Sequence, residues 1–307
     1  MASLTLELDA LTEQGLRQLS QQDGADASEI AARLLARAVR AARRRPVYDI
    51  DALIAANAPF ADEDLEIAES DAAERAELLA QEDAIDAFAK KGSQRWLQVA
   101  VNQAPDALLD VLRPALNLDS STEIIWRSPL ASDAFREYRD MAALNRLNIS
   151  SLPKRALSDF WPQRGPVWDA LGETSDGQSI FVEAKAHISE LASPPSRANP
   201  TSLALIQQSL SEAQHHFAPQ SNADWSKTFY QYCNRLAHHY LFRTINDLPT
   251  HMVFLYFVNA AEMRGPKSEA DWRGAITLLH STLGLEQTTI PGVHEIFLDV
   301  NLLKKYV

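Results

Sequence analysis

The segment that most constrains this chain resembles a buried strand but carries two charged side chains. Residues 179–186 read SIFVEAKA, with apolar side chains on both alternating sides, as expected for a strand covered on both faces. Glu183 and Lys185 are two positions apart, so both point to the same side, into the protein. Because a buried charge is costly unless it is paired or binds a metal, the pattern indicates that these charges have a role of their own.

The stretch before this segment is predicted to pair with it as a β-hairpin. Strands are expected over residues 166–172 and 179–187, with a glycine-containing turn between them. The midpoint between Asp169 and Glu183 is residue 176, which falls in that turn. We therefore expect the two carboxylates to lie opposite each other on adjacent strands.

Such a hairpin collects hard oxygen ligands in one place. The carboxylates of Asp169 and Glu183, with the backbone carbonyl of Ala184, form an all-oxygen site that suits Mg²⁺ or Mn²⁺. Lys185, on the same strand face, can orient an attacking water or stabilise the negative charge that builds on a phosphate. The structural alternative is a buried Glu–Lys ion pair with Asp169 serving the turn, although such pairs rarely add stability.

The order of the expected elements predicts an α/β fold, in which a mixed central sheet has helices on both sides. Further strands are expected over residues 122–126, 251–260 and 293–300. Helices are expected over residues 94–100, 105–116, 132–147, 201–217, 225–246 and 268–283.

An aspartate, thirteen residues and then Glu-Ala-Lys, on a hairpin within this order of strands, resembles the PD-(D/E)xK nuclease superfamily and its restriction-endonuclease-like fold. The resemblance covers about residues 120–300. It implies that Asp169 and Glu183 bind the metal and that Lys185 is the catalytic lysine. Trp168 stands where the superfamily usually has a proline.

The same resemblance implies a further acidic residue from the helix before the sheet. Glu137 is the best match for this additional metal ligand, and Asp140 is the next candidate. The alternative for Glu137 is a surface ion pair with Arg136 or Arg139. His187, at the end of the catalytic strand, is a candidate for binding substrate, and its alternative is an ordinary structural hydrogen bond.

The predicted helix over residues 225–246 is unusually polar for its aromatic content. Gln231, Asn234 and Arg235 lie at i, i+3 and i+4, so one face of this helix is polar and partly basic. Placed over the edge of the sheet, these three side chains would line the active cleft and bind substrate. The alternative is the solvated face of an amphipathic helix.

Residues 1–46 contain a short alternating strand, a helix, a glycine turn and a second helix. This order resembles the ribbon-helix-helix DNA-binding family. The resemblance implies a homodimer built on a two-stranded ribbon, with Thr5 facing the DNA groove and Ser28 at a phosphate. The alternative is a plain dimerisation or helical-hairpin module.

The formal net charge of −12 argues at face value against a nucleic-acid partner, but the charge is unevenly spread. Residues 47–91 hold thirteen acids against three bases and are expected to form an acidic helical linker. An alternative is an acidic arm that covers a basic surface. Residues 92–307, the expected nuclease-like domain, are near neutral, with 19 bases against 22 acids.

Cysteine usage and hydropathy predict a cytoplasmic protein. The one cysteine, Cys233, excludes an intrachain disulfide and fits a reducing compartment. The N-terminus does not resemble a signal peptide, and no window approaches the ~18 apolar residues of a membrane span. Zinc is not expected, because the sequence has no cysteine pair and no histidine spacing with a third ligand.

Together these features predict a Mg²⁺-dependent nuclease (Mn²⁺ is the alternative ion) that hydrolyses phosphodiester bonds in nucleic acid, DNA in the first place. RNA stays open as a substrate. The alternative from another class is a non-catalytic regulator that binds DNA or protein, as an antitoxin does, and carries a silent nuclease fold. A third interpretation is a structural ion pair in an α/β domain of unrelated function.

Overall fold

The computed structural model describes residues 88–307 except 197, 228 and 287. The predicted ribbon-helix-helix-like module (1–46), with Thr5 and Ser28, lies outside the described residues. The same holds for residues 47–87 of the predicted acidic linker.

A mixed sheet of five strands is the centre of the described part of the chain, in the order β1-β2-β3-β4-β5. The first three strands pair antiparallel, whereas β3, β4 and β5 run parallel to one another. This arrangement confirms the predicted α/β class with a mixed sheet. The strands are β1 (Ile124–Ser128), β2 (Ala170–Thr174), β3 (Ser179–Lys185), β4 (Thr250–Val258) and β5 (Val293–Asp299).

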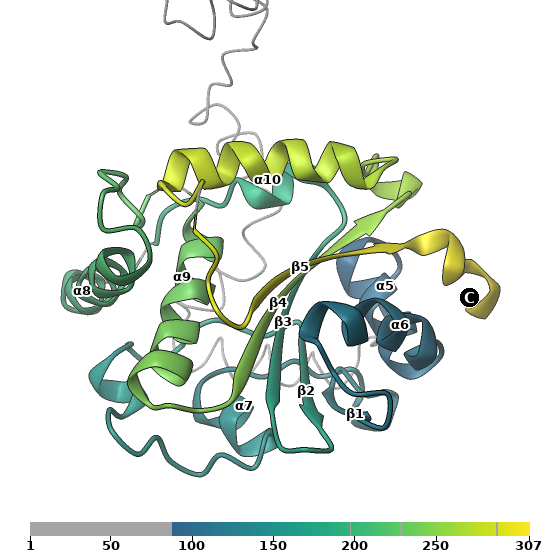
Figure 1. Ribbon diagram of the computed structural model, residues 1–307, viewed down its shortest axis with the longest axis horizontal. Helices are drawn as coiled ribbons and strands as arrows, with labels where there is room; N and C mark the ends of the chain where they lie inside the picture. The colour runs from purple at the N-terminus through teal and green to yellow at the C-terminus, as the bar shows by residue number, and fades with distance from the viewer. Residues whose placement is uncertain (1–87, 197, 228, 287) are drawn as a thin grey trace, which may run out of the picture. The chain divides into compact units, whose positions relative to one another are not determined.

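Helices cover both faces of the sheet, with α8, α9 and α10 on one side and α5 and α6 on the other (Figure 1). In the part of the chain that the structure describes, none of these helices is both long enough and apolar enough to cross a membrane. The helices are α5 (Gly92–Asn102), α6 (Pro105–Leu116), α7 (Asp140–Arg146), α8 (Pro200–Phe217), α9 (Tyr230–His239) and α10 (Glu269–Leu283). A π-helical turn, η4 (Tyr240–Ile245), continues α9, and the 3-10 turns are η1 (Ala131–Asp133), η2 (Leu157–Asp159), η3 (Ile188–Leu191), η5 (Ala261–Met263), η6 (Val300–Leu302) and η7 (Lys304–Tyr306).

Strand β3 sends its side chains alternately into the two helical layers. Ile180 and Val182 pack in the core under α5 and α6. Phe181 packs in the core under α8, α9 and α10. By the same alternation, Glu183 and Lys185 point to the side of α9. The backbone of β3 therefore decides which helix faces the two charged side chains.

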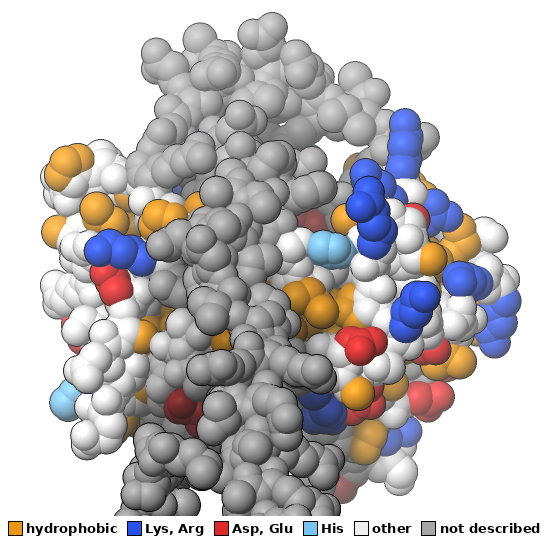
Figure 2. Space-filling model, turned by 90° about the horizontal axis from the view of Figure 1, so that it is seen from above, with side chains coloured by type: hydrophobic (Ala, Val, Ile, Leu, Met, Phe, Trp, Pro, Cys, Tyr) orange, Lys and Arg blue, Asp and Glu red, His pale blue; other side chains and the backbone are white. Residues whose placement is uncertain are grey.

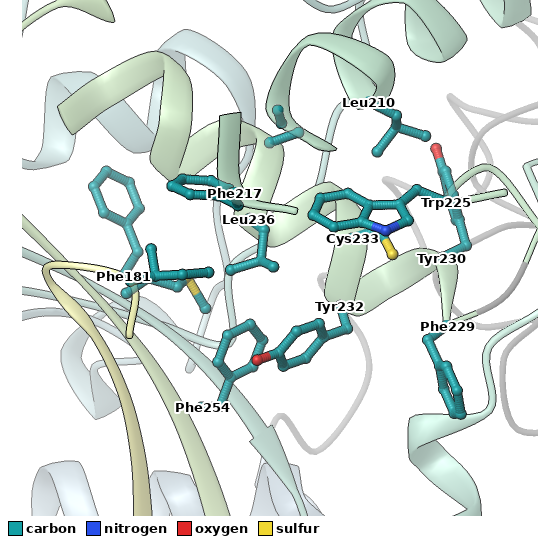
Figure 3. Packing of buried hydrophobic residues seen from close by; sticks show 14 of the residues in the cluster. Phe181, Leu210, Phe217, Trp225, Phe229, Tyr230, Tyr232, Cys233, Leu236 and Phe254 are labelled. Carbon is teal, nitrogen blue, oxygen red and sulfur yellow. The ribbon is translucent and has the colours of Figure 1, made fainter. Parts of the chain in front are cut away.

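Helix α9 is buried on nearly all sides. All of residues 232–239 are buried, and Gln231 is half-buried. The ring of Tyr232 stacks on Phe254 of β4, with 4.2 Å between the ring centroids, and Cys233 lies among the same buried side chains (Figure 3). The alternative of a solvated polar face on this helix is therefore wrong, because the sheet and α8 pack against it.

Local side-chain chemistry sets where these helices begin and end. Ser268 and Asp271 form a reciprocal capping box at the start of α10, and Gly284 ends that helix with a φ of 75°. The predicted helix over residues 225–246 begins later than expected, at Tyr230. Phe229, directly before it, has a left-handed φ of 52° that a continuous helix cannot accommodate.

Candidate active site at the end of the central hairpin

The register of the central hairpin brings the two predicted metal ligands together. Ala170 pairs with Val182, so the next position along the ladder sets Asp169 opposite Glu183, as predicted. Asp169 lies one residue before β2, which begins later than the expected strand. Its Oδ2 accepts a hydrogen bond of 2.6 Å from the backbone N–H of Ala184. The carboxylate is thereby fixed at the end of the hairpin.

Glu183 is held between two cations. Glu183 is buried, with only 2% of the residue exposed. Its Oε1 is 2.5 Å from Nζ of Lys185, and its Oε2 is 2.6 Å from Nη2 and 2.7 Å from Nε of Arg235. The Arg235 guanidinium also donates to the backbone carbonyl of Val167 at 2.8 Å and lies over the ring of Trp168. The buried carboxylate is therefore neutralised and positioned from two directions.

The ionisation of these groups follows from that pairing. Burial alone would raise the pKa of Glu183, but the Arg235 and Lys185 charges outweigh burial and hold that pKa below its usual range. Burial alone would lower the pKa of Lys185, but Glu183 and Asp169 reverse the effect and raise it. Lys185 is therefore a permanent ammonium group, which can donate hydrogen bonds and supply positive charge but cannot act as a base.

Two further carboxylates respond in the opposite way. Burial raises the pKa of Asp169 well above its usual range, and repulsion from Glu183 and Glu137 adds to the effect. Burial likewise raises the pKa of Glu190. Together with Glu183, Glu137 and the two cations, they form what we call the charged cluster. In the described structure this cluster has four carboxylates, Asp169, Glu183, Glu190 and Glu137, and two cations, Lys185 and Arg235.

Glu137 reaches the charged cluster from an extended segment. The predicted helix over residues 132–147 forms only from Asp140 onward, because Ala134 and Phe135 have left-handed φ values of 48° and 55°. An isolated antiparallel bridge between Tyr138 and Trp168 sets Glu137 beside Asp169 instead. Glu137 Oε1 also accepts a hydrogen bond of 3.3 Å from Gln94 of α5.

Asp140, the second candidate for that role, has a structural function. Its carboxylate accepts the backbone N–H groups of Arg164 at 2.8 Å and Gly165 at 2.9 Å. A side chain added at Gly165 would lie 2.9 Å from Asp140 Oδ1, so this contact depends on glycine. Asp140 thus anchors the loop that leads into β2.

Glu190 is a member of the charged cluster that sequence reasoning missed. It lies in η3, shortly after β3, and its Oε2 accepts hydrogen bonds from Ala186 N–H at 3.5 Å and Ser93 at 3.4 Å. Its Oε1 is buried and has no hydrogen-bond partner among the described residues. Its place five residues after Lys185 was a usable signal, but only the tight turn of η3 brings it back toward the lysine.

His187 makes its described contacts within its own turn. Its Nδ1 accepts the backbone N–H of Ser189 at 3.2 Å, which caps η3. Burial, and then the nearby charge of Arg264, lower its pKa. This hydrogen bond matches the structural alternative, and the contacts do not place His187 in the charged cluster.

A cavity of about 590 Å³ opens beside the charged cluster. Gln231, Asn234 and Arg235 of α9, the residues predicted to line the active cleft, all line this cavity. Gln231 Oε1 accepts a hydrogen bond of 3.1 Å from Lys185, and Asn234 Oδ1 accepts one of 2.8 Å from Arg235. Asp169 and the other carboxylates do not line the cavity, so it meets the cluster through Gln231 and Arg235. Arg235 is also buried in its ion pair with Glu183, which rules out the solvated alternative for this residue.

Within the described ranges, no group of three or more His, Cys, Asp or Glu side chains is close enough to hold a metal ion. The oxygen atoms available at the hairpin are the carboxylates of Asp169 and Glu183 and the backbone carbonyl of Ala184. Comparison with known protein families, with curated proteins and with solved structures finds no match. Inference about function therefore depends on the charged cluster and the cavity beside it.

Proposed function

We propose that this chain is a Mg²⁺- or Mn²⁺-dependent nuclease with a restriction-endonuclease-like domain, which hydrolyses phosphodiester bonds, in DNA in the first place. The observation that carries the proposal is the convergence of Asp169, Glu183 and Lys185 at one end of a hairpin. These are two acids and an ammonium group in the pattern that resembles the PD-(D/E)xK superfamily. A homodimer formed through residues 1–46 belongs to the same proposal.

The charge balance of the cluster supports a divalent cation. With all its groups ionised, the described cluster has four carboxylates against two cations, an excess of two negative charges. Burial raises the pKa of Asp169, and repulsion from Glu183 and Glu137 adds to the effect, so a divalent cation beside this carboxyl would compete with a proton. Two carboxylates and a carbonyl suit Mg²⁺, which keeps several of its waters. When bound, such an ion polarises a phosphoryl oxygen and lowers the pKa of a bound water.

The residues of the chain then have separate roles. Hydrolysis forms a bond from a water oxygen to phosphorus, breaks the bond from phosphorus to the leaving strand, and passes a proton from the water to the leaving oxygen. Lys185, held as an ammonium, stabilises the negative charge that grows on the phosphate oxygens. Asp169 and Glu183 are the ion's ligands, with Glu137 as a further candidate beside Asp169. Arg235 is a positioning residue, because it acts by fixing Glu183.

Basic side chains near the cluster offer contacts for a nucleic-acid backbone. Lys90 and Lys91 are exposed directly ahead of α5, and α5 supplies Ser93 and Gln94 as partners of cluster carboxylates. In Figure 2, Lys and Arg side chains gather on the right, the side on which Figure 1 shows α5, α6 and the C-terminal turns. Phosphates of a nucleic-acid backbone would be attracted to this side.

A cleavage assay tests the proposal. Purified protein with Mg²⁺ or Mn²⁺ should cut DNA, and Lys185→Ala should reduce the rate by at least about 10²–10³-fold, the usual effect of removing one transition-state donor. Lys154→Ala, which removes a lysine from an exposed ion pair with Asp247, is the matched control and should cut at the wild-type rate. If the wild type cuts neither DNA nor RNA with either ion, the proposal is wrong.

One observation favours the silent alternative. Both oxygens of Glu183 already have cationic partners, Lys185 and Arg235, so the ion pairs are complete without a metal. Calorimetric titration with Mn²⁺ separates the two candidates. The nuclease requires binding by the wild type and its loss in Asp169→Asn. A wild type that binds no Mn²⁺, together with DNA binding by the intact chain, supports a regulator with a silent nuclease fold.

A further inference from the structure

The walls of the cavity beside the charged cluster come from different parts of the chain. Residues 161–167, before β2, form one wall, and Ser193, Pro194, Ser196, Ala198 and Asn199, between β3 and α8, form another. Ser202 and Ile206 of α8 and Tyr230, Gln231, Asn234 and Arg235 of α9 complete the walls of the cavity. Its volume of about 590 Å³ lies within the usual ~300–1,000 Å³ of small-molecule sites. It can therefore enclose one small ligand.

The charge of the cavity selects for anions. Arg164 and Arg235 line it, and no Asp or Glu occurs among the described residues that do so. This is notable in a chain with a net charge of −12. The charge of Arg235 is balanced by its ion pair with Glu183, so Arg164 is the cation that favours an anion here. An arginine in a partly enclosed space suits a phosphate group, because arginine binds phosphate oxygens through planar pairs of donors.

The other walls suit a flat, partly apolar group. Trp161, Pro162 and Tyr230 contribute rings and aliphatic surface, and Ser193, Ser196 and Asn199 contribute small polar groups. Aromatic rings with a few hydrogen-bonding groups are the usual environment for a nucleobase. Cation, aromatic surface and polar groups in one chamber fit a nucleotide better than they fit free phosphate.

Given the proposed nuclease function, on which this inference rests, we propose that the cavity binds one unpaired nucleotide of the substrate strand. Its phosphate contacts Arg164, and its base lies toward Trp161 and Tyr230. A base inside a duplex cannot enter a chamber with walls on opposite sides, whereas a single-stranded or extruded base can. The enzyme therefore acts on single strands or on strand ends in preference to intact duplex.

Calorimetry on the full-length wild-type protein in EDTA measures binding without cleavage. The probes are thymidine 5′-monophosphate, thymidine and inorganic phosphate. We expect the nucleotide to bind at least tenfold more tightly than either fragment. Equal affinity for phosphate and nucleotide would reduce the cavity to a phosphate site and overturn the inference, as would absence of nucleotide binding.

Two variants test whether binding occurs in this cavity. Ser202→Trp, from a cavity-lining position at the start of α8, should fill the space and weaken nucleotide binding at least tenfold. Thr201→Trp, at the exposed neighbouring position that does not line the cavity, should leave binding unchanged. Arg164→Gln removes the charge without filling space and should also weaken binding several-fold. Equal effects of Ser202→Trp and Thr201→Trp would overturn the assignment.

The two proposals fail in different ways. Nucleotide binding in the cavity without cleavage of any nucleic acid would retain the binding site and reject the nuclease. Equal cleavage of single-stranded and duplex DNA, with no binding of the nucleotide, would retain the nuclease and reject the cavity as a nucleotide site.

Discussion

Buried ionisable groups are charged at one end of strands β3 and β4 and neutral at the other end. At one end, Glu183 lies between Lys185 and Arg235 and all three stay charged. At the other end, His251 of β4 hydrogen-bonds to His294 of β5 through ring nitrogens 2.9 Å apart. There, burial lowers the pKa of His251 to about 4, and the neighbouring His294 and the positive charge of Arg243 add to the effect.

The difference follows from the neighbours of each group. The groups that influence His251 are, in order, His294, Arg243, His239 and Asp176, and only Asp176 favours a positive charge there. His251 therefore stays neutral, which is the usual way to reduce the cost of burying an ionisable group. The charged end keeps its charges by opposing them, an arrangement that rarely benefits stability alone. The contrast is consistent with the proposed function, because the charged groups contribute little to stability on their own.

Removing a cation from the charged end should have the largest effect on stability. Arg235→Met leaves a buried carboxylate with half of its neutralising charge, so the free energy of unfolding should fall by about 3–5 kcal/mol. Urea unfolding followed by circular dichroism measures this change. The double variant Arg235→Met/Glu183→Gln should be more stable than Arg235→Met, because it also removes the carboxylate charge that has lost one of its two cationic partners.

The control for that experiment is an ion pair in water. Lys154 and Asp247 form an exposed pair, with side chains 55% and 68% exposed. Lys154→Met should change the free energy of unfolding by less than about 1 kcal/mol. A loss in Arg235→Met no larger than this would remove the contrast between buried and exposed charge.

Acid should weaken the histidine end by an intermediate amount. A histidine in the unfolded chain titrates near ~6.5. His251 in the folded chain titrates at about 4. Between these values the unfolded chain binds more protons, so the free energy of unfolding falls as pH falls, by on the order of 1–3 kcal/mol. His251→Gln should reduce this loss, as measured by unfolding at a series of pH values.

A matched histidine elsewhere sharpens that comparison. His215 is exposed on α8, so His215→Gln should leave the pH dependence of stability unchanged. If His251→Gln and His215→Gln give the same pH profile as the wild type, the histidine end does not carry the acid sensitivity.

The smallest expected effect is an increase in the free energy of unfolding when Asp169, at the charged end, is replaced by asparagine. The pKa of Asp169 is raised in the folded chain, which therefore binds more protons than the unfolded chain above the usual aspartate range. Stability from this group falls as pH rises through the raised pKa, and Asp169→Asn removes the fall. In EDTA at neutral pH, Asp169→Asn should be more stable than the wild type by about 1 kcal/mol. Thermal unfolding that shows a destabilised variant would contradict this interpretation.

Features that depend on residues close together in the chain could be predicted from the sequence, whereas features that depend on distant residues could not. The pairing of Asp169 with Glu183 was predictable, because a hairpin register depends on a turn a few residues long. The helix expected around Glu137 was wrong, because left-handed residues and the bridge from Tyr138 to Trp168 replace its first turns. The burial of Arg235 was also not predictable, since its partner Glu183 is 52 residues away.

The sequence by itself determined that Glu183 and Lys185 share one face of a covered strand and that Asp169 lies opposite, because alternation and hairpin pairing are properties of a short stretch of backbone. Only the tertiary structure decided which groups neutralise them. Packing α9 across the sheet buried Arg235 against Glu183, and the same packing formed the cavity beside Gln231. These contacts join segments far apart in the chain, so burial and counter-charge are fixed only when the whole domain folds.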